Sequence, residues 1–313
     1  MTIAWLFPGQ GSQSVGMAKD VLAASAAARD VFERVDAALG ERLSRLILEG
    51  PEDELTLTAN AQPAIVATSV AVLAAVRERI PDLPAPAFAA GHSLGEYSAL
   101  VAAEALSLED AVRLVRARGR AMQDAVAPGS GAMSAVMGIE PERVQAICDE
   151  AAQGEVVSAA NFNGPGQVVI AGHAAAVERA GKLASAEKAR VMPLKVSAPF
   201  HCSLMEPAAR AVGAELERIA IRDPRFPVVA NFDAAPNTQA SRVKDLLVRQ
   251  VCGAVRWDES VRLMASSGAR RALEIGPGRK LAGLVKRIAK ELEVLPVDDA
   301  ASIEKVSSFL AGG

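Results

Sequence analysis

The sequence predicts an α/β fold with a largely parallel sheet and a smaller subdomain inserted into the chain. Short runs of β-prone residues alternate with longer helical patterns, an order typical of parallel sheets covered by helices. Half of the 313 residues are hydrophobic and only 4% are aromatic, which fits one main domain with a core of aliphatic side chains. Residues 132–195 show the order βαββαβ, which is that of a ferredoxin-like unit.

The first part of the chain predicts the strand and helix units of the main domain. The run of apolar residues that begins at Pro63 has the composition of a helix buried against a sheet, with proline at its first position. Ser107 and Asp110 form a capping box that opens the last of these helices. The expected elements are a strand at 3–7, a helix from about Val15, a helix at 63–79, a strand at 85–90, a helix from 96 to Ala105 and a helix from 107 to about 126.

The middle of the chain predicts the insert. The Pro-Gly-Ser-Gly segment at 128–131 breaks the preceding helix, so we place a subdomain boundary there. The main domain is therefore expected at 1–127 and 197–313, and the ferredoxin-like insert at 128–196. The insert is expected to have strands at 132–137, 156–161, 167–172 and 189–195, and helices at 141–152 and 174–188.

Charge, cysteine content and hydropathy exclude several kinds of protein. A net charge of −3 without basic clusters argues against nucleic acid as a partner. The three cysteines are far apart and form no CxxC pair, which predicts a reducing cytoplasm and no metal site. No signal peptide is expected, and polar residues and Pro63 interrupt the longest uncharged stretch, 55–76. We therefore expect a soluble, cytoplasmic protein that does not bind membranes.

The Gly-His-Ser-Leu-Gly motif at 91–95 is the main indication of chemistry. A G-x-S-x-G between a strand and a helix is typical of a nucleophile elbow, in which the serine lies on a strained turn. Ser93 would then lie at a helix N-terminus. There the amide of Leu94 favours a developing oxyanion.

A serine nucleophile needs a base, and the sequence has three histidines. His92 is adjacent to Ser93, and neighbouring side chains on a turn usually diverge. His173 lies at a turn of the insert, where a solvated or capping role is the default. His201 lies where the chain re-enters the main domain, and loops at such junctions commonly carry site residues. Elimination therefore favours His201 as the base.

Arg118 lies on the apolar face of its helix. At 100° per residue it shares that face with apolar side chains, whereas Arg113, Arg116 and Arg120 fall on the opposite face and are expected in solvent. A buried guanidinium needs an anionic partner. That partner is either an internal Asp or Glu or a substrate carboxylate, and helix periodicity alone favours the internal salt bridge.

Three glutamines have less specific contexts. The loop that contains Gln10 lacks the lysine of a phosphate-binding loop, and a backbone amide for an oxyanion hole is an equally good interpretation. For Gln62 and Gln250, composition does not separate a surface amide from a site residue.

Six motifs together resemble the malonyl-CoA:acyl carrier protein transacylases of fatty acid synthesis. The resemblance spans nearly the whole chain and implies an α/β-hydrolase-like main domain with a ferredoxin-like insert. The motifs are FPGQGSQ at 7–13, QPA at 62–64, GHSLGEYSA at 91–99, RG at 118–119, APFH at 198–201 and GPG at 276–278.

The resemblance implies a ping-pong reaction in which Ser93 takes malonyl from malonyl-CoA and passes it to the phosphopantetheine thiol of acyl carrier protein. Coenzyme A enters as part of the substrate, and no cofactor or metal is implied. His201 is the implied base and then acid. The other roles implied are oxyanion binding by the amides of Gln10 and Leu94, carboxylate binding by Arg118, orientation of the histidine by the main-chain carbonyl of Gln250, an acyl-pocket position for Gln62 and malonyl selectivity for Phe200.

Two alternatives from other classes stay open. A serine hydrolase shares the elbow but uses water as acceptor; an acid between serine and histidine would favour it, and Asp110 and Asp124 are candidates within helical patterns. A non-catalytic docking module for a carrier protein would tolerate Ser93→Ala. Within the transferases, the sequence does not separate a fatty acid enzyme from one that serves a polyketide synthase in trans, and we expect a monomer.

Overall fold

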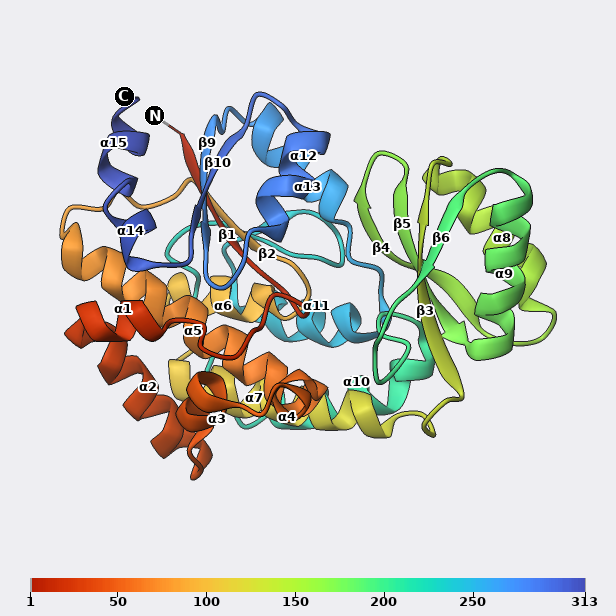
Figure 1. The fold of residues 1–313 in the computed structure, drawn as a ribbon, viewed down its shortest axis with the longest axis horizontal. Helices are drawn as coiled ribbons and strands as arrows, with labels where there is room; N and C mark the ends of the chain where they lie inside the picture. Colours follow the sequence, from red (N-terminus) through yellow and green to blue (C-terminus); the bar gives the residue numbers. More distant parts are fainter. Residues whose placement is uncertain (1, 313) are drawn as a thin grey trace.

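The structure, a computed structural model, describes residues 2–312. A six-stranded sheet forms the centre of the main domain, in the order β10-β9-β1-β2-β7-β8 (Figure 1). All neighbouring pairs are parallel except β7 and β8. The strands are β1 (Ile3–Phe7), β2 (Phe88–Gly91), β7 (Val228–Val229), β8 (Pro236–Asn237), β9 (Arg271–Ile275) and β10 (Glu293–Val297). This confirms the predicted α/β class.

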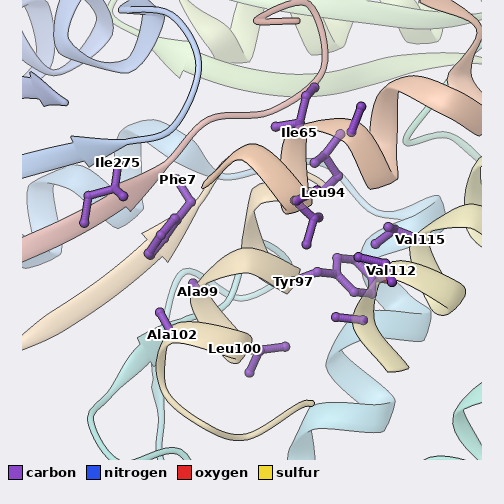
Figure 2. Packing of buried hydrophobic residues seen from close by; sticks show 14 of the residues in the cluster. Phe7, Ile65, Leu94, Tyr97, Ala99, Leu100, Ala102, Val112, Val115 and Ile275 are labelled. Atoms are coloured by element: carbon purple, nitrogen blue, oxygen red, sulfur yellow. The ribbon is translucent and has the colours of Figure 1, made fainter. Parts of the chain in front are cut away.

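Side chains on both faces of the sheet are buried. In β1, Trp5 and Phe7 belong to one hydrophobic cluster, and Ala4 and Leu6 to another. Alternate residues of a strand point to opposite faces, so an entirely apolar strand is what a parallel sheet covered on both sides requires. Figure 2 shows Phe7 in the larger cluster, near Leu94 and other side chains of the adjacent helices.

Helices cover the two faces of the sheet. The larger cluster contains residues of α2, α5, α6 and α7, whereas α12 and α13 pack with the smaller one (Figure 1). The helices before the insert are α1 (Lys19–Ala24), α2 (Ala26–Leu39), α3 (Leu43–Glu49), α4 (Glu52–Thr56), α5 (Thr58–Arg79), α6 (Gly95–Ala102) and α7 (Leu108–Asp124). Those after it are the short 3₁₀ helix η1 (Ser203–Met205), α10 (Glu206–Leu216), α11 (Ala240–Cys252), α12 (Trp257–Ser266), α13 (Lys280–Ile288), α14 (Ala300–Ile303) and α15 (Val306–Ala311).

The insert has the βαββαβ order that the sequence predicts. Its antiparallel sheet has the order β4-β5-β3-β6, and its helices pack against that sheet around a separate hydrophobic cluster (Figure 1). The elements are β3 (Gly131–Met137), α8 (Pro141–Ala152), β4 (Val157–Gly164), β5 (Gln167–His173), α9 (Ala174–Ala186) and β6 (Arg190–Pro193). They lie within the predicted range 128–196, although the domain boundaries themselves stay a prediction.

Two expected helix limits differ from the structure. Pro63 does not open its helix, because α5 begins at Thr58 and the proline lies within it. Packing explains the longer helix: Thr58 is buried, and a Cβ at Gly119 of α7 would lie 2.6 Å from its carbonyl oxygen. The helix expected to reach Ala105 ends at Ala102, and Glu104 just beyond has a φ of +58°, which right-handed helix does not allow.

Helix α5 is long and apolar enough to cross a membrane, and 78% of its apolar window is buried inside the fold. That degree of burial is the pattern of a core helix. Its buried residues include Ile65, which Figure 2 labels within the larger hydrophobic cluster.

Candidate active site

Ser93 lies on a sharp turn between β2 and α6. Its φ of +52° places it in the left-handed region, which is strained for a residue with a side chain. A Cβ at Gly91 would lie 1.9 Å from the carbonyl carbon of Gly95, and one at Gly95 would lie 2.2 Å from the carbonyl oxygen of Phe7. Only glycine fits at either position, which gives the G-x-S-x-G pattern a steric cause.

The backbone of the turn is held by Asn231, which follows β7. The amide of Ser93 donates to Asn231 Oδ1 at 2.6 Å, and Asn231 Nδ2 donates to the carbonyl of Gly91 at 2.7 Å. The sequence analysis missed this residue. The available signal was a polar side chain at the carboxyl end of a strand beside β2, but β7 has two residues and leaves no recognisable pattern.

His201 is in hydrogen-bond contact with the serine. The Ser93 Oγ to His201 Nε2 distance is 2.8 Å, and His201 Nδ1 lies 2.9 Å from the carbonyl oxygen of Gln250 and 3.2 Å from that of Gly253. Carbonyl oxygens only accept, so Nδ1 carries the proton and Nε2 presents its lone pair to the serine. The structure thus brings together the residues that elimination and the resemblance paired.

The environment keeps His201 neutral. Burial, reinforced by the positive charge of Arg118, lowers the pKa of His201 to about 3. The imidazole can therefore accept a proton at neutral pH. Asp110, one of the acids considered for a hydrolase, instead bonds to Ser107 and Arg113.

Arg118 is buried beside Ser93, and its burial is what its helical position predicts. It is 1% exposed, and its Nη1 donates to Gln62 Oε1 at 2.7 Å. Its Nη2 donates to Ser93 Oγ at 3.1 Å and to Gln250 Oε1 at 2.9 Å. No carboxylate between residues 2 and 312 lies within 4.0 Å of the guanidinium, so the internal salt bridge that periodicity favoured is wrong. All these partners are neutral oxygens, which leaves the charge available to a ligand.

Arg116 corrects another expectation. Helix periodicity placed it in solvent with Arg113 and Arg120, and the latter two are exposed. Arg116 is only 7% exposed and pairs with Glu41 and Asn60. Residues before α3 and at the start of α5 contribute these partners, and a helical wheel built from one segment has no information on such neighbours.

Gln250 contacts four other residues of the site through three of its atoms. Its backbone carbonyl accepts from His201, and its side-chain oxygen accepts from Arg118. Its Nε2 donates to the carbonyl of Ser93 at 3.0 Å and to Glu96 Oε2 at 2.8 Å. The main-chain contact is the one that the resemblance implies, whereas the side-chain contacts were not foreseen.

Glu96 is a buried carboxyl below the turn, and the sequence analysis gave it no role. It is 3% exposed, and its Oε2 accepts from the Asn231 amide at 2.9 Å as well as from Gln250. Burial raises the pKa of Glu96 to about 7, against the opposing effect of these hydrogen bonds and of Arg118. The GHSLGE segment contained the residue, but its partners are 135 and 154 positions away.

The site opens into a cleft of about 890 Å³ between the main domain and the insert. The loop with Gln10 forms one wall beside the turn, since a Cβ at Gly9 would lie 2.4 Å from the carbonyl oxygen of His92. Within residues 2–312 the backbone amides of Gln10 and Leu94 have no hydrogen-bond acceptor. Phe200 and Gln62 also line the cleft, both nearly buried.

The other two histidines have structural partners. His92 Nε2 lies 2.8 Å from Asn163 Oδ1 in the insert, and His173 Nδ1 accepts from the amide of Val156 at 2.9 Å. In the part of the chain that is described, no three His, Cys, Asp or Glu side chains gather as they would around a metal ion.

The model of a family described as acyl transferase domain matches residues 4–308 of the chain. The chain belongs to the acyl transferase domain family. A malonyl CoA-acyl carrier protein transacylase of Haemophilus influenzae is 47% identical over 308 residues, which cover 98% of both chains. These matches confirm the resemblance that the six motifs predicted.

Solved structures of the family share the fold over their full length. An acyl-carrier-protein-S-malonyltransferase from Bartonella henselae superposes with a TM-score of 0.96 at 47% identity, covering 99% of this chain and 100% of that one. A malonyl-transacylase solved in complex with its type II PKS acyl-carrier protein gives a TM-score of 0.96 at 45% identity, with the same coverage.

Proposed function

We propose that this chain transfers a malonyl group from malonyl-CoA to the phosphopantetheine thiol of acyl carrier protein, through a malonyl ester of Ser93. One observation carries the proposal: a buried guanidinium without a carboxylate partner lies 3.1 Å from the oxygen of a serine that is paired with a neutral histidine. A serine-histidine pair indicates acyl transfer, and the adjacent cation favours an acyl group with a carboxylate. The curated relatives act on the same substrate class.

The first half-reaction forms the ester. Ser93 Oγ attacks the thioester carbonyl while His201 Nε2 takes the hydroxyl proton, and the amides of Gln10 and Leu94 donate to the oxyanion. The carbon–sulfur bond then breaks, and His201 returns the proton to the departing coenzyme A thiolate. The main-chain carbonyls at Nδ1 hold the imidazole in the required tautomer without a buried negative charge.

The second half-reaction reverses these steps with a new thiol. The phosphopantetheine thiol gives its proton to His201 Nε2, and its sulfur attacks the malonyl carbonyl. The tetrahedral intermediate collapses, and Ser93 Oγ leaves and regains the proton from His201. Between the two halves Arg118 holds the malonyl carboxylate, with Gln62 and Gln250 orienting its two terminal nitrogens.

The cleft fits both thioesters. Its volume of about 890 Å³ can take a phosphopantetheine arm, and Phe200 and His201 both line it. The cations Lys195, Arg279, Lys280 and Arg287 line the cleft as well and can meet phosphates or an acidic carrier. We assign the reaction to the cytoplasm, the compartment that three separate cysteines without a CxxC pair favour.

A hydrolase is the less favoured alternative. His201 is oriented by the backbone carbonyls of Gln250 and Gly253 rather than by an acid, whereas serine hydrolases with this kind of elbow orient the histidine with Asp or Glu. A polyketide pathway is a second candidate for the carrier, favoured by the 45% identity to a malonyl-transacylase solved with a type II PKS acyl-carrier protein.

Intact-protein mass spectrometry tests the proposal. Wild type and Ser93→Ala are mixed with malonyl-CoA, and phosphopantetheinylated carriers of fatty acid and polyketide type are then added separately. A malonyl adduct in wild type alone, discharged onto a carrier faster than into water, is the expected result. An adduct lost at the same rate without a carrier would establish a hydrolase, and the faster carrier identifies the pathway.

A further inference from the structure

Glu96 lies at the junction of two hydrogen-bonded arms that both return to Ser93. One arm runs from Glu96 Oε2 to the Asn231 amide, and the Asn231 side chain accepts the Ser93 amide. The other runs from the same oxygen to Gln250 Nε2, which also donates to the Ser93 carbonyl. The N–H and C=O groups of the strained nucleophile are thus both tied to one carboxyl oxygen.

The second arm extends to the carboxylate receptor. The Gln250 amide donates to Glu96 at one end and accepts from Arg118 Nη2 at the other, at 2.8 and 2.9 Å. An amide fixed at its nitrogen has its oxygen fixed as well. Arg118 has no carboxylate within 4.0 Å among the described residues, so Gln250 and Gln62, together with Ser93 Oγ, set the direction of its terminal nitrogens.

We propose that Glu96 is a positioning residue for malonyl transfer, which holds the Ser93 turn through Asn231 and the Arg118 guanidinium through Gln250 in one fixed arrangement. This inference rests on the proposed function. Glu96 has no contact with the cleft and touches neither the nucleophile's oxygen nor the acyl group, so its effect passes through its two partners.

The role of Glu96 depends on an oxygen that accepts from both the Asn231 amide and Gln250 Nε2, rather than on a negative charge. Burial raises the pKa of Glu96 to about 7, so the uncharged carboxyl is already present at neutral pH. The charged and titratable groups around it are Arg118 on α7, Asp233 after β7, Tyr97 on its own helix and His201 beyond Gln250. A glutamine oxygen can accept the same two hydrogen bonds, whereas an aspartate oxygen falls one methylene short.

Three variants test whether the acceptor oxygen or the negative charge of Glu96 matters: Glu96→Gln, Glu96→Asp and Glu96→Ala. The measurement is the rate of Ser93 acylation by malonyl-CoA and by acetyl-CoA, which has no carboxylate for Arg118. Misplaced reacting groups slow both reactions, by roughly ten- to a hundredfold in Glu96→Asp and Glu96→Ala. Loss of the Gln250 arm additionally lowers the malonyl-to-acetyl ratio, by roughly threefold or more. Glutamine is expected to keep both the rates and the ratio close to wild type.

Glu274 provides the matched control. It is fully buried, accepts from the amides of Leu281 and Ala282 at 2.9 and 2.8 Å, and has its pKa raised by burial to about 7. Glu274→Ala is expected to lower the melting temperature without changing the malonyl-to-acetyl ratio, because neither arm of the Glu96 network includes it.

The outcomes are distinct. A wild-type malonyl-to-acetyl ratio in folded Glu96→Asp or Glu96→Ala overturns the inference. So does faster Ser93 acylation in Glu96→Asp than in Glu96→Gln, since that order indicates an effect of charge. If Glu96→Ala does not fold, Gln and Asp still decide. Absence of a malonyl ester in wild type refutes the proposed function itself, whereas a normal wild-type ester with an unaltered ratio in Glu96→Asp refutes only the role of Glu96.

Discussion

Replacing Arg118 with alanine should convert a malonyl-selective site into one that does not distinguish malonyl from acetyl. The two terminal nitrogens of a guanidinium carry four hydrogens. In the structure Gln62 and Gln250 accept two of them and Ser93 Oγ accepts a third. A bound carboxylate can therefore accept two hydrogen bonds from Arg118: one from the remaining hydrogen on Nη1, and one from the Nη2 hydrogen that Ser93 Oγ accepts in this structure.

The magnitude follows from these two bonds. Hydrogen bonds to charged groups contribute about 1.5–3 kcal/mol each. Taking the low end, because the carboxylate must also lose water, gives about 3 kcal/mol, or roughly a hundredfold in rate. Acylation by malonyl-CoA should fall by that factor in Arg118→Ala. Acylation by acetyl-CoA should change much less, since acetyl has no group to lose.

The assay is time-resolved mass spectrometry of the Ser93 adduct with each thioester. Arg116→Ala is the control, because Arg116 is a buried arginine of the same helix that pairs with Glu41 away from the cleft. It should lose stability and keep the malonyl preference. An unchanged preference in Arg118→Ala would refute the carboxylate-binding role.

Three further predictions concern the base, the turn and its glycines. The pKa of His201 is lowered to about 3, so the rate of Ser93 acylation should stay constant from pH 8 down to about pH 5. An inflection of that rate near pH 6.5 would contradict this. The unfolded chain binds the His201 proton at a higher pH than the folded one, so the free energy of unfolding should fall as the pH drops from 6.5 towards 3. Asn231→Ala leaves the Ser93 amide unpaired, so it should lower the free energy of unfolding by about 1–3 kcal/mol and also slow Ser93 acylation. Its control is Asn237→Ala, which removes a buried side chain bonded to Gln239 and should lower the free energy of unfolding alone. Gly95→Ala should prevent folding, because the new Cβ would lie 2.2 Å from the carbonyl oxygen of Phe7. In the control, Gly283→Ala, the new Cβ has no atom within 4 Å, and alanine should stabilise α13 by about 1 kcal/mol. A soluble, active Gly95→Ala protein would show that the turn can relax.

Features encoded by neighbouring residues were predictable from the sequence. The turn at 91–95 needs glycines at fixed offsets from Ser93, and the buried position of Arg118 follows from helical periodicity alone. The βαββαβ insert has strands and helices long enough to leave clear patterns. His201 required elimination among three histidines, which a chain richer in histidine would not have allowed.

Several contacts between distant segments could not be predicted from local patterns. Asn231 meets Ser93 across 138 positions, and Gln250 meets it across 157. Neither segment has a periodicity that points to the turn. The burial of Arg116 depends on Glu41, 75 positions away, and the early start of α5 depends on packing against α7. In each case the deciding energy is a tertiary contact, which overrides a local preference.

The absence of an acid behind His201, within residues 2–312, bears on the choice of acceptor. A carboxylate at Nδ1 would stabilise the imidazolium and strengthen the base. Here burial and the charge of Arg118 disfavour the imidazolium, and the hydrogen bonds to the carbonyls of Gln250 and Gly253 offset this only in part. The same base must take the proton of the Ser93 hydroxyl, so its weakness alone does not exclude water. Of the two acceptors, a thiol loses its proton at a pKa of about 8.5 and water at about 15.7, which favours the thiol in the second half-reaction. We therefore expect the Ser93 ester to be discharged faster by a carrier thiol than by water, and the ratio of the two rates measures this preference.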